Sequence, residues 1–142
     1  DKNDIDKFIA MGCSGVQMAT RFIGTFECDA DAQFKNVLLN AKAEDIQLMK
    51  SPVGLPARGV MTNLQFSIEN KTAPKVQCIS NCVSPCNRGH EAKIVGYCIA
   101  DRLGAAYQGD TQTGLFFSGS NGYRIDKIIS VKELMEKLTV GE

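Results

Sequence analysis

With 142 residues, 44% of them hydrophobic and 23% charged, the chain has the composition of one soluble globular unit. Its 16 acidic residues balance 16 basic ones, so we expect neither nucleic acid nor a membrane as a partner. The sequence has no apolar run near the roughly 20 residues of a spanning helix and no secretory signal, which favours a cytoplasmic, reducing location. Of the six cysteines, Cys13 and Cys28 lie in apolar stretches typical of buried free thiols.

The first third of the sequence predicts a helix, a buried strand and a second helix. Asn3 or Asp4 can cap the first helix, which Gly12 ends. The short apolar run "SGVQMATRF" follows and predicts a buried strand that ends near Thr20. Asp29 can cap the second helix. This alternation is typical of a parallel α/β protein.

The rest of the sequence predicts mainly helices. Prolines and glycines make "KSPVGLPARGVMTN" a structured loop, and residues 64–70 read as a short helix. A longer helix is expected over residues 91–107, and "GLFFSG" reads as a strand followed by a turn. The last helix begins at a capping box that starts with Ser130.

The predicted strands are too few to close a sheet. Only the strand within "SGVQMATRF" has a strong pattern, and a parallel strand that is buried on both faces needs a neighbour on each side. The sequence also begins with Asp1 rather than Met. We therefore expect the chain to be a piece of something longer.

Two stretches carry a resemblance to a known family. "GCSGVQMATRF" and "DADAQFKNVLLNAKAEDIQLMKSPVGLPARG" resemble the later part of the nitronate monooxygenases, formerly called 2-nitropropane dioxygenases, a family that includes flavin-dependent enoyl-acyl-carrier-protein reductases. The family's members are FMN-binding (β/α)8 barrels. The resemblance implies an α/β fold: residues 1–62 end a flavin-binding TIM barrel, and residues 63–142 form a mostly helical, cysteine-containing extension whose terminal helix packs on the barrel.

The resemblance also implies a cofactor site. In the family the FMN phosphate rests on backbone amides of a Q-M-G-T sequence, which matches Gln17, Met18, Ala19 and Thr20 here. Free N–H groups at the carboxyl end of a barrel strand suit a phosphate. Alanine replaces the usual glycine, and a positive φ there would be strained. The family's catalytic histidine belongs to the earlier half of the barrel, and His90 does not match its motif.

The segment "CISNCVSPCNRGHEAKIVGYC" spaces four thiols as C-x3-C-x3-C-x11-C. Three successive cysteines and one remote cysteine favour a [4Fe–4S] cluster held by Cys78, Cys82, Cys86 and Cys98. Zinc is the alternative, with either Cys98 or His90 as its fourth ligand, although zinc sites usually show two tight pairs. Disulfides would require an oxidising compartment, which no other feature of the sequence supports. Unligated thiols remain open, because Cys98 also lies on an apolar helix face.

Two weaker signals concern the substrate. "SGSNGYR", residues 118–124, offers small residues and amide donors where the family's C-terminal segment returns to the substrate side, although its glycines can equally turn the chain after a strand. Arg58 and Lys50 could meet a phosphopantetheine group or an acidic carrier protein, although isolated surface cations are usually only solvated.

These features lead to one principal functional expectation and two alternatives. The first is that the chain is part of an FMN-dependent oxidoreductase. The resemblance to a bacterial subgroup implies an acyl-carrier-protein dehydrogenase/isomerase of unsaturated fatty-acid synthesis. We expect the 142-residue chain alone to be inactive. The second is a nitronate monooxygenase that uses FMN and oxygen. The third is a zinc-stabilised binding module without catalysis. Expected partners are the remaining part of the barrel and a carrier-linked or small-molecule substrate, with a homo-oligomer left open.

Overall fold

The computed structural model describes residues 1–79, 82, 86 and 90–141. Its α-helices are α1 (Lys2–Ala10), α2 (Thr20–Ile23), α3 (Ala32–Asn40), α4 (Asn63–Glu69), α5 (His90–Val95), α6 (Ile99–Tyr107) and α7 (Val131–Thr139). Its strands are β1 (Ile46–Met49), β2 (Ala57–Val60) and β3 (Phe116–Phe117). Two 3₁₀ turns lie at Ala43–Asp45 and Gly122–Arg124.

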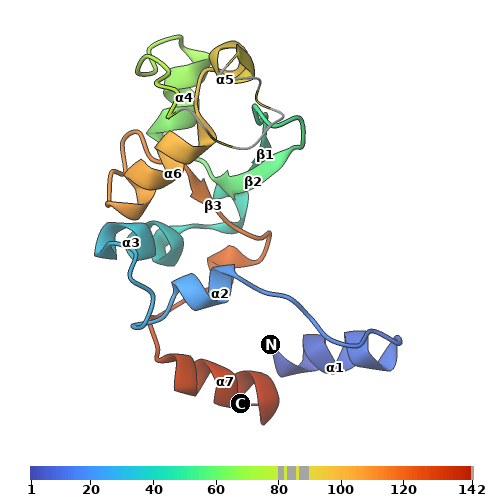
Figure 1. Ribbon diagram of the computed structural model, residues 1–142. Helices are drawn as coiled ribbons and strands as arrows, with labels where there is room; N and C mark the ends of the chain where they lie inside the picture. The colour runs from blue at the N-terminus through green and yellow to red at the C-terminus, as the bar shows by residue number, and fades with distance from the viewer. Residues whose placement is uncertain (80–81, 83–85, 87–89, 142) are drawn as a thin grey trace.

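The described strands form one small antiparallel sheet in the order β1-β2-β3 (Figure 1). In its register Ile46 faces Val60, and Gly59 faces Phe117. A Cβ atom at position 59 would lie 2.4 Å from the backbone oxygen of Phe116, so only glycine allows β2 and β3 to approach this closely. The prediction that residues 50–63 form only a loop was therefore wrong, because β2 lies within them. The strand predicted at "GLFFSG" is confirmed.

Helix α3 covers the sheet and forms the main core with it (Figure 1). The predicted apolar face of this helix buries Phe34 and Leu38. The ring of Phe34 meets the fully buried ring of Phe116 edge-on, with centroids 4.9 Å apart. Burying side chains of this size stabilises a fold by about 1.5–3 kcal/mol each. The helix begins after Asp31, whose carboxylate accepts from the Gln33 N–H group, rather than after Asp29.

Helices α1 and α7 lie together at the other end of the molecule, away from α4 and α5 (Figure 1). A second apolar cluster is centred on Leu134 and Leu138 of α7, with Ile5 and Phe22 packed against it. The capping residue of α7 is confirmed, because Ser130 Oγ accepts from the Glu133 N–H group at 3.0 Å. Helix α1 starts one turn earlier than expected and buries none of its residues.

The helix predicted over residues 91–107 is broken into α5 and α6. The break falls at Gly96, which has a φ of +99°, a conformation that other residues reach only with strain. After this break the chain turns so that Tyr97 is buried with Leu64 and Leu115. Helix α4, by contrast, agrees with the predicted helix at 64–70 to within one residue at either end.

The buried strand predicted near residues 15–20 is absent. Residues 14–19 form irregular, mostly exposed backbone that runs from α1 to α2 (Figure 1). No described strand lies beside this segment, so it has no ladder partner and cannot become a strand. Parallel pairing among the described residues is limited to a single bridge between Thr25 and Ile129, and the expected parallel sheet is not part of this structure.

Candidate functional site

The segment that the family motif identifies, residues 17–20, lies against residues 119–122. The two segments are joined by a hydrogen bond from the Gly119 N–H group to Thr20 Oγ1 at 3.0 Å. At Gly122 a Cβ atom would lie 2.0 Å from Ser118 Oγ, so a larger residue would not fit this turn. Part of the stretch at 118–124 therefore lies beside the motif, a contact that the sequence analysis did not predict.

A cavity of about 350 Å³ lies at this junction, and we call it the loop pocket. It is lined by Gln17, Met18, Ala19, Thr20, Arg21, Gly119, Ser120, Asn121, Gly122 and Ile125. Apolar atoms make up more of this lining than polar ones. Its polar side chains carry amide, hydroxyl and guanidinium groups, and it contains no carboxylate among the described residues. The backbone N–H groups of residues 17–20 donate to no described acceptor. Such a wall suits an anion with several acceptor oxygens.

Ala19 fits the loop pocket without strain. Its φ is −127° and its ψ is −51°, so it does not adopt the positive φ that would favour glycine. The sequence difference from the family's Q-M-G-T motif therefore leaves this backbone conformation accessible. Alanine also keeps the backbone N–H group that a phosphate site requires.

An apolar groove of about 410 Å³ continues from the loop pocket, because Ala19, Thr20 and Gly119 line both. The apolar part of the groove comes from α2, the β1–β2 loop, β2, α6 and β3. It consists mainly of Ile23, Val53, Leu55, Pro56, Ala57, Ile99 and Phe117. Arg58 is the only ionisable residue among the described groove residues, and its side chain is exposed. Lys50 instead lines a separate hollow beside the β1–β2 loop.

Tyr97 holds the β1–β2 loop, part of which lines this groove. Its side chain is 4% exposed, and its hydroxyl donates to the backbone oxygen of Lys50 at 2.6 Å. Burial raises the pKa of Tyr97 to about 12, so the hydroxyl stays protonated and remains a donor at neutral pH. A part-buried hydrogen bond therefore holds the β1–β2 loop to the residue that precedes α6 by two positions.

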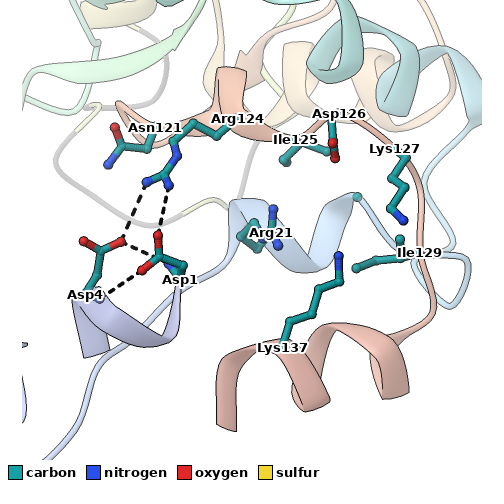
Figure 2. Close-up of a pocket in the computed structure, with 11 residues that line it drawn as sticks. Asp1, Asp4, Arg21, Asn121, Arg124, Ile125, Asp126, Lys127, Ile129 and Lys137 are labelled. Atoms are coloured by element: carbon teal, nitrogen blue, oxygen red, sulfur yellow. Dashed lines mark hydrogen bonds and ion pairs between the residues drawn. The ribbon is translucent and has the colours of Figure 1, made fainter. Parts of the chain in front are cut away.

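A third cavity, of about 250 Å³, lies on the other side of Arg21, and we call it the charged pocket (Figure 2). Arg124 forms ion pairs with Asp1 at 3.0 Å and Asp4 at 3.7 Å. Lys127 and Lys137 line the same cavity. The sequence analysis gave Asp4 only a capping role and did not predict this group of ion pairs.

The four clustered cysteines are not brought together as a ligand set. Cys86 and Cys98 are buried side by side in an apolar cluster that includes Val53, while Cys82 is exposed and Cys78 is half-buried. The part of the chain that is described contains no group of three metal-ligating side chains. The residues do not fit a four-thiolate cluster here, so the iron–sulfur and zinc predictions are not supported. Residues 80–81, 83–85 and 87–89 and the His90 side chain lie outside the described part.

The remaining two cysteines differ in burial. Cys13 is exposed in the turn after α1, and Cys28 is half-buried before α3. The prediction of a buried thiol at Cys13 was therefore wrong, because the apolar stretch around it is itself exposed. None of the helices in the described residues has the length and apolar character needed to cross a bilayer.

The sequence matches the model of a known protein family over nearly its whole length. The model of the family described as "Nitronate monooxygenase" matches residues 1–141. The chain therefore belongs to the nitronate monooxygenase family.

Two solved structures have a similar fold over this length of chain. A point mutant of FabK from Thermotoga maritima matches with a TM-score of 0.70 at 23% identity, over 97% of this chain and 37% of that one. FabK from the same organism matches with a TM-score of 0.69 at 25% identity, over 94% of this chain and 38% of that one. The chain thus spans less than two fifths of the length of these structures. Among curated proteins none matches the sequence.

Proposed function

We propose that this chain forms the flavin-binding end of an FMN-dependent oxidoreductase that acts on an acyl-carrier-protein thioester. The observation that carries the proposal is the loop pocket, where residues 17–20 meet residues 119–122 and open into an apolar groove. Donor groups at one end suit a phosphate, and apolar walls at the other suit a ring or an acyl chain. The family to which the chain belongs is FMN-dependent, which supports the same cofactor here.

The residues present fit the FMN phosphate. The N–H groups of Gln17, Met18, Ala19 and Thr20 have no described acceptor and are available to phosphate oxygens. Gly119 and Gly122 leave room beside them, since neither places a side chain in the pocket. When bound, FMN supplies the flavin ring that exchanges hydride with the substrate. The apolar groove residues would exclude water from that exchange.

We propose that residues 1–62 complete a (β/α)8 barrel in the whole protein and that residues 63–142 form its C-terminal extension. Two observations support this: the likeness to FabK, a TIM-barrel enzyme, and the exposed backbone at residues 14–19, which has no strand beside it. The missing neighbours would come from the remaining part of the barrel. That part would also supply the catalytic histidine that the family resemblance implies.

The substrate follows from the groove and from the structural relatives. The similarity to FabK, an enoyl-acyl-carrier-protein reductase, favours a carrier-linked acyl chain, and the groove offers an apolar wall for such a chain. Arg58 is exposed at the groove, where it could meet an acidic carrier protein. The finer assignment, a dehydrogenase/isomerase of unsaturated fatty-acid synthesis, rests on sequence resemblance. Oxidation of an alkyl nitronate is the second candidate, which the family description favours.

The test uses the complete protein that contains this chain. Flavin released by heating should co-elute with FMN in chromatography, at close to one FMN per protein. Turnover should be faster with decanoyl- or enoyl-acyl-carrier protein than with alkyl nitronates. A protein that retains no flavin would contradict the cofactor assignment. A protein that oxidises only nitronates would keep the cofactor and replace the substrate with the second candidate.

A further inference from the structure

Arg21 follows the phosphate motif directly and lines both the loop pocket and the charged pocket. It is the only ionisable side chain among the ten described residues around the loop pocket. The other lining residues contribute backbone amides, neutral polar groups and apolar side chains. A phosphate monoester carries close to two negative charges at neutral pH, and neutral donors alone leave that charge uncompensated.

Arg21 also has no competing partner within the described structure. No described carboxylate lies within ion-pair distance of its guanidinium group, and its side chain makes no hydrogen bond there. In Figure 2 it lies on α2 between the ion-paired group of Asp1, Asp4 and Arg124 and the side chain of Lys137, and no dashed line reaches it. Arg21 is half-buried, so its charge is less screened than that of a fully exposed arginine.

The nearby cations are already paired. Arg124 contacts two carboxylates, and Lys127 and Lys137 both contact Glu133, at 3.4 Å and 3.7 Å. Moving any of them to a phosphate would first break an existing ion pair. Arg21 can turn its planar fork to an anion without such a loss.

We infer that Arg21 binds the phosphate of the flavin and makes the site select FMN over riboflavin, which lacks that phosphate. This inference rests on the proposed function, because it assumes that the loop pocket holds a flavin phosphate. Hydrogen bonds from an arginine to a phosphate are charge-assisted and can form in pairs, so this one side chain should account for much of the selectivity.

The experiment measures the dissociation constants of FMN and riboflavin for the complete apoprotein by quenching of flavin fluorescence. Arg21→Gln should weaken FMN binding by about 10- to 100-fold and leave riboflavin binding within about twofold. Arg21→Lys should fall between, because it keeps the charge and loses the fork. The matched control is Arg124→Gln, which removes a neighbouring cation that does not line the loop pocket.

Two outcomes would overturn the inference. One is an unchanged ratio of FMN to riboflavin affinity in Arg21→Gln, and the other is an equal change in Arg124→Gln. Unchanged riboflavin binding shows that the Arg21→Gln variant is folded. If Arg21→Gln does not fold, the ratio of FMN to riboflavin affinity in Arg21→Lys tests the inference in its place. Failure of the wild-type protein to bind either flavin would instead reject the proposed function.

Discussion

Thr20 links the two segments of the loop pocket through one hydrogen bond, and its side chain lies where the proposed phosphate would bind. Thr20→Asp in the complete protein should weaken FMN binding by on the order of 2 kcal/mol or more, roughly 30-fold, because a carboxylate would face the phosphate. Flavin titration measures the change. Thr20→Asn is the control, since an asparagine side chain has nearly the same shape as an aspartate side chain and carries no charge. Equal affinities in the two variants would place the phosphate elsewhere.

Tyr97 offers a prediction about stability and pH. Tyr97→Phe should lower the free energy of unfolding by about 0.5–1.5 kcal/mol, because it removes a part-buried hydrogen bond to the backbone oxygen of Lys50. The pKa of Tyr97 is about 12 in the folded protein and near 10 when unfolded. The unfolded state therefore loses this proton first, and stability should fall as pH rises from about 10 to 12.

Urea denaturation at several pH values tests both effects in the complete protein. The fall in stability above pH 10 should be smaller in Tyr97→Phe than in the wild type. Tyr123→Phe is the matched control, because the exposed Tyr123 hydroxyl has no hydrogen bond to the described residues. A Tyr97→Phe variant with unchanged stability would mean that the hydroxyl does not anchor the β1–β2 loop.

At the scale of the element, the break between α5 and α6 depends on one residue. Gly96→Ala should destabilise the protein by about 1–2 kcal/mol, because φ is positive there and the new Cβ would lie 3.2 Å from Ile68. Gly104→Ala should instead stabilise the protein by about 0.5–1 kcal/mol. Gly104 lies inside α6, and a Cβ atom there would have open space around it. Thermal unfolding measures the change in melting temperature of each variant. Equal changes in the two variants would argue against a left-handed backbone conformation at residue 96.

The elements that could be predicted are those whose pattern is local. Helix α7 shows its cap at Ser130 and its apolar spacing within ten residues, and the structure confirms the cap. Strand β2 was missed because it is four residues long, lies among prolines and glycines, and depends on β1 and β3 for its pairing. The strand expected before Thr20 failed for the same reason, since a strand requires a partner that no local pattern supplies.

The residues of the candidate site were likewise predicted only in part from the sequence. The family motif located residues 17–20, and the small residues after β3 pointed to residues 118–124, but only the structure brings the two together. Arg21 was missed because arginine belongs to no part of the motif, and its place beside Thr20 was the only signal. The cysteine spacing suggested shared ligands, whereas spatial separation and burial decide whether thiols meet, and only Cys86 and Cys98 do so among the described residues.

At the scale of the whole molecule, apolar side chains are exposed around α1 and the segment that follows it. Phe8 is 46% exposed, Met11 is 70% exposed, and Val16 is 41% exposed. If the rest of a barrel covers this face, the isolated 142-residue chain should self-associate and bind FMN poorly. Light scattering during size-exclusion chromatography measures the association. A monomer at high concentration with tight FMN binding would contradict the proposal that further chain completes the barrel.

Paired substitutions locate that face. Phe8→Gln together with Met11→Gln should reduce self-association and leave the helical circular dichroism unchanged, because α1 buries none of its residues. Ile94→Gln is the control, since Ile94 is also exposed but lies on α5, at the far end of the molecule from α1 (Figure 1). An equal effect of Ile94→Gln would indicate non-specific apolar association.

The hydrogen bond between Thr20 and Gly119 joins residues that are 99 positions apart in the sequence. The proposed cofactor site therefore cannot form until both segments have been synthesised. The motif at residues 17–20 leaves the ribosome long before its partner segment, and closing so long a loop carries an entropic cost that only the completed fold offsets. Flavin loading should therefore be a late, post-translational step. A nascent chain that stops before residue 119 would have the motif and no pocket, so bound flavin would report that synthesis and folding had both reached their end.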